Sequence, residues 1–295
     1  MGRNQTWITE VILLGFQVEP ALEVFLFGLF LLFYSITMMG NGTILGLIWL
    51  DLRLHSPMYF FLSHLAIIDM SYASSTVPKM LANLTFLYLA FAVTECMVLV
   101  VMSYDRYVAI CHPLQYTIIM SWRVCAGLVA TCWAFSFLLA LVHVVLLLRL
   151  PFCGPHVINH FFCEVLSVLK LACADTWLNQ VVIFAACVFI LVGPLCLVLL
   201  SYTRILFAIL RIQSGEGRRK AFSTCSSHLC VVGLFFGSAI VIYMAPKSSH
   251  SQEQRKILSL FYSLFNPMLN PLLYSLRNAE VKGALRRALW KQRSM

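Results

Sequence analysis

The stretch MSYDRYVAICHPLQY, residues 102–116, closes a long apolar run with charge, histidine and proline. Asp105 and Arg106 are adjacent at the end of an apolar span, where charged side chains are costly unless they contact water or a partner. On a helix the two can pair locally while Arg106 points inward, and Pro113 then ends the helix. A cluster that only halted membrane insertion would not need so long and specific a run, so we interpret it as a functional element.

Composition predicts a membrane protein around this stretch. The chain has 295 residues, of which 61% are hydrophobic and 11% charged, which is too apolar for a soluble domain of this size. Apolar runs of about 20 residues indicate transmembrane helices, and lipid favours helices because the backbone must satisfy its own hydrogen bonds. We predict an all-α membrane protein, a single seven-transmembrane domain over 1–295 with its helix bundle at 24–276. The seven spans are 24–49, 57–82, 86–110, 124–148, 180–204, 222–245 and 257–276.

Charge predicts the orientation of the bundle. Lysine and arginine lie mostly in alternate links and at the C-terminal end, so the positive-inside rule places those segments in the cytosol. An odd number of spans then makes 1–23 extracellular and 277–295 a cytoplasmic tail. The net charge of +9 is therefore a topology signal, and no nucleic-acid partner is expected. No cleavable signal peptide is expected either, because a polar start precedes a first span too long for one.

Three local patterns add detail to this arrangement. Asn4 begins an Asn-Gln-Thr sequon on the predicted outer side, so we expect it to be glycosylated. Residues 211–220 are short and rich in glycine and charge, and we expect a turn there. From Leu276 to Trp290 apolar residues alternate with basic ones, which predicts a short amphipathic helix on the membrane lipid of the inner leaflet.

Two acids lie deep in apolar spans: Asp69 in the second and Glu95 in the third. Charge at mid-membrane is expensive and is usually functional. Asn41 and Asn270 come from the first and seventh spans at similar depth. These oxygen ligands suit sodium or a divalent cation. The alternative is a pair of carboxylates that share protons and hydrogen bonds without any metal.

The family resemblance rests on a series of motifs in a fixed order. They are Gly40-Asn41, PMYFFLSHLAIIDMSYASSTVPKM (57–80), the MSYDRY run, Ser201-Tyr202, KAFSTCSSHL (220–229) and NPLLYSLRN (270–278). The set resembles the odorant receptors of the larger, terrestrial-type class (class II) among the rhodopsin-like G protein-coupled receptors. The resemblance implies a non-enzymatic plasma-membrane receptor for small volatile odorants. It also implies a heterotrimeric stimulatory G protein as partner, a rise in cyclic AMP, and trafficking chaperones.

The resemblance also implies a switch at the cytosolic end. Hydroxyl-bearing aromatic residues near Arg106 can exchange partners when helices shift, which is what a bistable element needs. The alternative is that each tyrosine only anchors its helix at the membrane interface. The residues that match the coupling and switch positions are Asp105, Arg106, Tyr107, Tyr202, Lys220, His228 and Tyr274.

The ligand pocket implied by the resemblance lies in the outer half of the bundle. None of its residues is Asp, Lys or Arg, so a charged ligand would be poorly compensated and neutral odorants are favoured. Tyr243 and Ser263 are the expected hydrogen-bonding hydroxyls, and Phe236 stands where the family usually has tyrosine. The full set is Tyr88, Leu89, Ala92, Val93, Ile183, Ala186, Cys187, Ile190, Phe236, Ala239, Ile240, Tyr243 and Ser263.

The connection between the second and third spans departs from the family pattern. Residues 79–86 read KMLANLTF, where the family has a longer loop with a cysteine at the outer start of the third helix. We expect Asn83–Thr85 to turn the chain. The family pairs that missing cysteine with the residue matching Cys163 and pairs the two matching Cys153 and Cys173 with each other. The alternative to a signalling receptor is therefore a poorly folded, non-signalling relic, partly retained in the endoplasmic reticulum.

The cysteines provide a first test. We predict a Cys153–Cys173 disulfide and an unpaired Cys163, because the usual partner of Cys163 is missing. Alkylation followed by mass spectrometry should label Cys163 and neither of the other two. A peptide linking Cys163 to Cys153 would contradict the assignment.

Inserting a family-like loop with its cysteine between Leu84 and Phe86 should raise surface expression, and should raise it less when Cys163→Ser is also present.

Overall fold

A computed structural model describes residues 12–13, 20–74, 81–152, 157–158, 165–211, 213–244, 254, 263, 265–277 and 279–293. Within these residues the chain is almost entirely helical. The long helices are α1 (Pro20–Leu50), α2 (Pro57–Ser74), α3 (Leu81–Cys111), α5 (Trp122–Leu148), α7 (Trp177–Cys187), α8 (Gly193–Leu210), α9 (Gly215–Tyr243), α11 (Asn266–Arg277) and α12 (Ala279–Arg293). Short elements are η1 (Leu52–Leu54), η2 (Pro113–Gln115), α4 (Tyr116–Ile119), α6 (Val165–Leu169) and the π-helical turn η3 (Val188–Val192).

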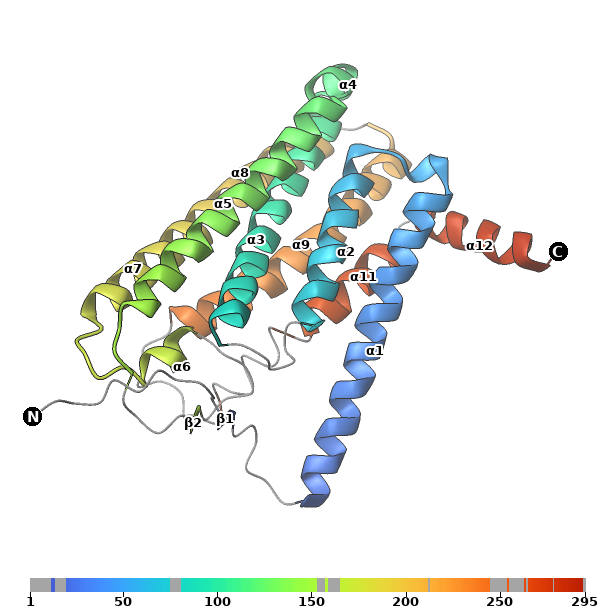
Figure 1. The fold of residues 1–295 in the computed structure, drawn as a ribbon. Helices are drawn as coiled ribbons and strands as arrows, with labels where there is room; N and C mark the ends of the chain where they lie inside the picture. The colour runs from blue at the N-terminus through green and yellow to red at the C-terminus, as the bar shows by residue number, and fades with distance from the viewer. Residues whose placement is uncertain are drawn as a thin grey trace, which may run out of the picture.

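The long helices form an all-α bundle, as the sequence predicts (Figure 1). The elements α7, η3 and α8 follow one another without a break and make one continuous rod. At one end lie α4 and η1, and at the other lie α6 and a small pair of strands. These strands, β1 (Ile12–Leu13) and β2 (Val157–Ile158), are parallel with Ile12 opposite Val157 and are the only strands in the described residues.

Five helices in the described part of the chain are long and apolar enough to cross a membrane. They are Val24–Leu50, Phe86–Cys111, Trp122–Leu148, Trp177–Leu210 and Gly215–Tyr243. The second and seventh predicted spans correspond to α2 and α11, which have 18 and 12 residues. The predicted end of the second span and most of the first half of the seventh lie outside the described residues.

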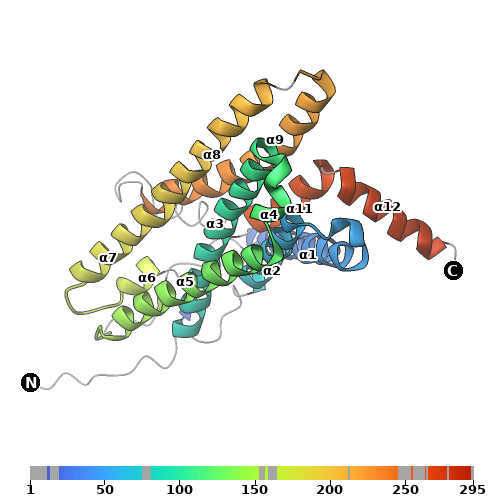
Figure 2. The ribbon, with the colours of Figure 1, turned by 90° about the horizontal axis from the view of Figure 1, so that it is seen from above.

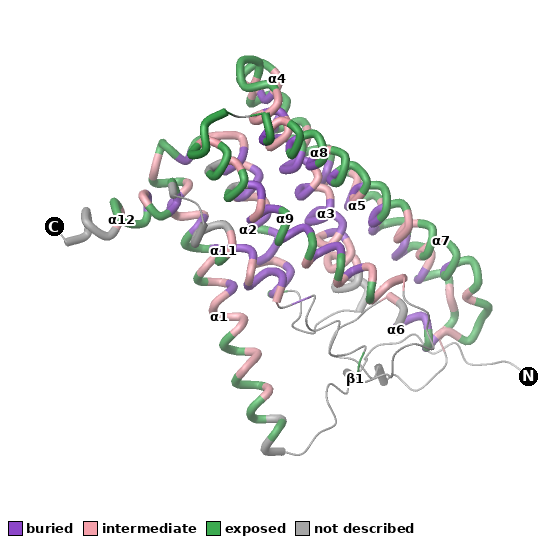
Figure 3. Tube along the Cα trace, turned by 180° about the vertical axis from the view of Figure 1, so that it is seen from behind, coloured by how far each residue is buried: buried purple, intermediate pink, exposed green. Residues whose placement is uncertain are grey.

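Helix α3 lies at the centre of the bundle and packs against α2, α5, α8 and α9. Its Leu99 and Met102 are fully buried, as is Ile68 on α2. Figure 3 shows the buried residues concentrated on α2, α3 and the inner sides of their neighbours. By contrast, α1 and α7 leave large side chains such as Phe25 and Phe184 mostly exposed. A surface of this kind is suited to lipid rather than water.

One expected turn is wrong, and another is shorter than expected. Asn83–Thr85 lies inside helix α3, which begins at Leu81, so the chain does not turn there. The inner link does fall within 211–220, but α8 ends at Leu210 and α9 begins at Gly215, so the rest of that segment is helical. Ser214 is the N-cap of α9, and its side chain accepts a hydrogen bond from the Gly217 backbone N–H at 2.9 Å. This cap satisfies a backbone donor that a helix start leaves free, so the helix can begin despite two nearby glycines.

The amphipathic helix α12 is present and leads away from the bundle beside α11 (Figure 2). Val281 and Ala284 are buried on its inner face. Arg287 Nε donates to Asp51 Oδ2 at 3.0 Å, and Tyr59 Oη donates to Glu280 Oε2 at 2.6 Å. The hydrogen bond from Arg287 lowers the pKa of Asp51, so the ion pair is present at neutral pH. It is lost only as the pH falls through this lowered pKa.

We predict that Arg287→Met releases α12 from the turn after α1. Amide hydrogen exchange in α12 should become faster, by no more than about fivefold because the ion pair is exposed. High salt should shrink the difference by screening the pair. Arg286→Met is the matched control, since Arg286 carries the same charge at the adjacent exposed position. Equal exchange rates in the two variants would contradict an anchoring role for Arg287.

Candidate ligand cavity and switch sites

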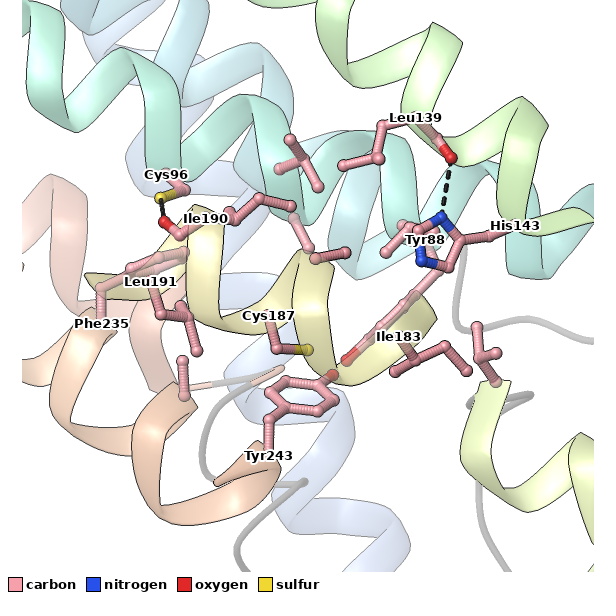
Figure 4. A pocket seen from close by; sticks show the side chains of 16 residues that line it. Tyr88, Cys96, Leu139, His143, Ile183, Cys187, Ile190, Leu191, Phe235 and Tyr243 are labelled. Carbon is pink, nitrogen blue, oxygen red and sulfur yellow. Dashed lines mark hydrogen bonds between the residues drawn. The ribbon is translucent and has the colours of Figure 1, made fainter. Parts of the chain in front are cut away.

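A cavity opens between α3, α5, α9 and the α7–η3 rod, at the end of the bundle that also carries α6. It contains about 750 Å³ of space free of atoms, part of which is open to solvent. Its lining side chains are drawn in Figure 4 and are Tyr88, Leu89, Ala92, Val93, Cys96, Leu139, His143, Val165, Ile183, Ala186, Cys187, Ile190, Leu191, Phe235, Ala239 and Tyr243.

Most of the predicted pocket residues meet at this cavity. Those that line it are Tyr88, Leu89, Ala92, Val93, Ile183, Ala186, Cys187, Ile190, Ala239 and Tyr243. Phe236, Ile240 and Ser263 do not. Phe236 is buried against Phe235 in an edge-to-face contact with ring centroids 5.3 Å apart, and Phe235 lines the cavity in its place. Ser263 is buried elsewhere.

Sequence reasoning missed the contribution of α5. Leu139 and His143 lie one turn apart on that helix and both line the cavity. The expected pocket drew on the third, fifth, sixth and seventh spans only. A histidine within an apolar span was a usable signal, because polar side chains in a membrane are commonly functional.

The cavity wall is apolar apart from a few groups. No aspartate, glutamate, lysine or arginine belongs to the described lining. Tyr88 packs against Tyr72 with ring centroids 4.8 Å apart. In Figure 4 the hydroxyl ends of Tyr88 and Tyr243 point toward each other across the cavity. Such a wall suits an uncharged, mostly apolar ligand.

A second group of polar residues lies deeper, where α1, α2 and α11 meet. Pro271 has no backbone N–H, so the carbonyl of Pro267 loses its partner one turn away. Asn41 Nδ2 donates to that carbonyl at 3.2 Å and to the Thr37 carbonyl at 3.1 Å. Gly40 allows the close approach this requires, because a Cβ there would lie 3.0 Å from Pro271 Cγ.

The predicted cation residues lie in this group. Asn270 Nδ2 donates to both carboxylate oxygens of Asp69, at 3.2 and 3.0 Å. Glu95 is also buried, and its Oε1 has no hydrogen-bond partner. Buried polar atoms normally have partners, so a buried carboxylate oxygen without one fits a cation ligand. Among the described residues no cluster of three or more His, Cys, Asp or Glu is present.

The predicted switch residues occupy the opposite end of the bundle. Asp105 is buried and accepts a hydrogen bond from Tyr116 Oη at 2.8 Å. Burial and the nearby Asp105 charge raise the pKa of Tyr116, which keeps its hydroxyl protonated as a donor. Within the described residues the partner of Asp105 is therefore Tyr116, where local pairing with Arg106 was expected. Arg106 Nε is buried without a hydrogen-bond partner.

Tyr202 and His228 join α8 to α9 near Arg106. Tyr202 Oη lies 2.7 Å from His228 Nδ1, and the two rings stack with centroids 5.7 Å apart. Arg106 is close enough to both to interact electrostatically. Tyr107 Oη lies 3.2 Å from His112 Nε2. The side chains of Lys220 and Tyr274 lie outside the described residues.

The remaining predicted sites are only partly described. Cys173 is in a disulfide. Phe152 pairs with Ala172 in an antiparallel bridge, and the Cys173 N–H donates to the Pro151 carbonyl at 3.0 Å. Cys153, Cys163 and Asn4 lie outside the described residues. The pairing, the free thiol and the glycosylation therefore stay predictions.

Comparison with known proteins decides the family. Residues 30–292 match the family described as olfactory receptor. Olfactory receptor 2A12 and olfactory receptor 2A5, both from Homo sapiens, are 79% and 75% identical, each over all of this chain and all of the relative. Olfactory receptor 2A7 from Mus musculus is 60% identical over the same full extents. This chain belongs to the olfactory receptor family.

Membership fixes the general class of the protein. Olfactory receptors are G protein-coupled receptors and not enzymes, and this one is a multi-pass membrane protein with an odorant and a G protein as partners. The alignment with olfactory receptor 2A12 spans 310 positions, whereas this chain has 295 residues. Some positions of the relative thus have no counterpart here, which agrees with a shortened connection between the second and third spans.

Proposed function

We propose that this olfactory receptor detects small, mostly neutral volatile molecules in the outer cavity and activates a stimulatory G protein that raises cyclic AMP. The observation that carries the proposal is the cavity itself, with an apolar wall and no charged side chain in its described lining. A ligand with a net charge would lose its hydration there without gaining a counter-ion. Neutral molecules lose far less hydration free energy when they enter the cavity.

The cavity and the cytosolic switch share the same helices. Cys96 lines the cavity, and the helix that carries it, α3, continues to Arg106. Cys96 Sγ also donates to the Ile190 carbonyl at 3.2 Å, which ties α3 to the π-helical turn. A ligand that moves α3, η3 and α9 relative to one another would alter the Tyr202–His228 pair at the other end. A discrete change of partners of this kind suits a two-state switch.

The membrane orientation follows from charge and from α12. We propose an extracellular N-terminus and a plasma-membrane location, with the basic face of α12 on inner-leaflet lipid. Trafficking chaperones would assist delivery, because the shortened connection removes one disulfide. A non-signalling relic held in the endoplasmic reticulum is not favoured, since α3 begins before the predicted turn and packs into the bundle along its described length.

Arg106→Ala tests the coupling mechanism. We expect odorant-driven cyclic AMP to be lost while surface expression stays near that of the unmodified receptor, because Arg106 faces the inner end without a protein hydrogen bond at Nε. Surface staining and cyclic AMP are measured in the same cells. Arg123→Ala is the control, since Arg123 is an exposed residue on the neighbouring α5. Undiminished signalling by Arg106→Ala at equal surface level would defeat the mechanism.

We also propose that the deep acids hold a cation, sodium or a divalent ion. The unpartnered Oε1 of Glu95 supports this, together with Asp69, whose oxygens both accept from Asn270. When bound, the ion would supply positive charge between two carboxylates that otherwise repel each other. Asp69 and Glu95 would hold it, and Asn270 would orient Asp69. The competing arrangement has the two acids sharing protons without an ion.

Thermal unfolding in different salts tests the ion. The midpoint of the purified receptor should be higher in sodium chloride than in choline chloride, by about 2–4 °C for each kcal/mol of binding free energy. Asp69→Asn and Glu95→Gln should each remove the difference. Magnesium and calcium chloride, at matched ionic strength, test for a divalent ion. Equal midpoints in all four salts would favour shared protons.

A further inference from the structure

One side chain in the cavity wall has a polar atom with no partner in the described protein. His143 on α5 is 6% exposed and lines the cavity. Its Nδ1 lies 2.8 Å from the Leu139 carbonyl oxygen, one turn back on the same helix. No hydrogen bond to its Nε2 exists among the described residues. Nε2 is not among the fully enclosed polar atoms that lack a partner, so it reaches open space.

The bond to Leu139 fixes which ring nitrogen carries the proton. A carbonyl oxygen can only accept, so Nδ1 must be the N–H donor in this contact. In a neutral imidazole the other nitrogen then has a lone pair and no hydrogen. A doubly protonated ring would place a net charge beside an apolar wall, and no acidic side chain in the described lining would pair with it. His143 therefore offers the cavity an acceptor at Nε2.

The position of the ring makes this acceptor available to a ligand. Figure 4 shows the imidazole of His143 held by Leu139 on one side and facing the cavity on the other, near Tyr88. The same wall includes Leu139, Val165 and Ile183, which have no polar side-chain atoms. A ligand that buries Nε2 without donating to it would leave an unpaired polar atom, which costs free energy.

We propose that His143 selects odorants that carry a hydroxyl donor, namely alcohols and phenols, over ligands that can only accept. The hydroxyl donates to Nε2 while the hydrocarbon part contacts the apolar wall. Ethers have no hydrogen to donate, and carboxylates would bring a second lone pair against Nε2. The inference rests on the proposed odorant function of this cavity and adds the chemical class of its ligand.

An alcohol and its ether isomer have the same composition and nearly the same size, so comparing their binding isolates the effect of the hydroxyl donor. Suitable probes are n-octanol with heptyl methyl ether, cyclohexylmethanol with methoxycyclohexane, and phenethyl alcohol with benzyl methyl ether. Binding to the purified full-length receptor in lipid nanodiscs is followed as a concentration-dependent rise in the thermal midpoint. This measurement does not depend on signalling. In at least one pair the alcohol should bind about tenfold more tightly than the ether, the factor that a buried hydrogen bond contributes.

Variants at His143 assign the preference to Nε2. His143→Phe keeps a ring but removes the acceptor. The affinity for the alcohol should therefore fall about tenfold, while the affinity for the ether changes by less than about twofold. His143→Gln can place an amide oxygen in the same region and should retain part of the preference. Ser136→Ala is the matched control. Ser136 on α5 bonds to the Cys132 carbonyl at 2.7 Å in the same one-turn manner but does not line the cavity.

The outcomes separate this inference from the proposed function. An alcohol preference that disappears in His143→Phe and persists in Ser136→Ala supports the role of His143. Ethers that bind as tightly as their alcohol isomers, or a preference unchanged in His143→Phe, overturn the inference while leaving the odorant cavity standing. If no member of any pair raises the midpoint, the inference and the assignment of this cavity to such odorants fail together.

Discussion

The hydrogen bond from Asn41 to the Pro267 carbonyl is the contact on which the deep part of the bundle depends. Inside a membrane no water is available to satisfy a carbonyl that a proline has left unpaired. Pro271 creates that carbonyl on α11, and Asn41 on α1 satisfies it at 3.2 Å. Gly40 brings the two helices close enough for the bond. Also on α11, Asn270 Nδ2 donates to the carboxylate of Asp69 on α2 at 3.0 Å. Three helices are thereby joined through polar contacts that lipid cannot replace.

The same requirement explains why the functional groups are so few and so localised. In an apolar bundle every polar side chain must find a partner or face a ligand. Asp105 finds Tyr116, Tyr202 finds His228, and Asp69 finds Asn270. Atoms left without a partner are candidates for binding a ligand or an ion, or for changing partner. Three of them lie at the sites proposed above: Glu95 Oε1, Arg106 Nε and the cavity-facing Nε2 of His143.

Much of this arrangement was predictable from the sequence. The apolar runs gave the helical bundle, and the alternation of apolar and basic residues after the seventh span gave α12. Several of the expected pocket positions lie together at one cavity, because helical spacing puts Tyr88 and Ala92 on one face of α3. The turn expected at Asn83–Thr85 is absent, and the one expected at 211–220 is shorter than predicted. Turn signals compete with helix capping, and a capping residue such as Ser214 can start a helix beside two glycines.

The sequence by itself determined that the chain is a helical membrane receptor, because hydrophobicity and motif order are properties of the chain that need no packing. Only the tertiary structure decided which side of each helix faces the cavity. Phe235 lines it and Phe236 does not, although they are neighbours of identical chemistry, because the rotation of α9 is fixed by packing against α3, α8 and α11. Likewise α5 contributes His143 to the wall through its packing on α3. Adjacent residues on a helix point about 100° apart, so helix rotation selects the functional side chain, and contacts with other helices set that rotation.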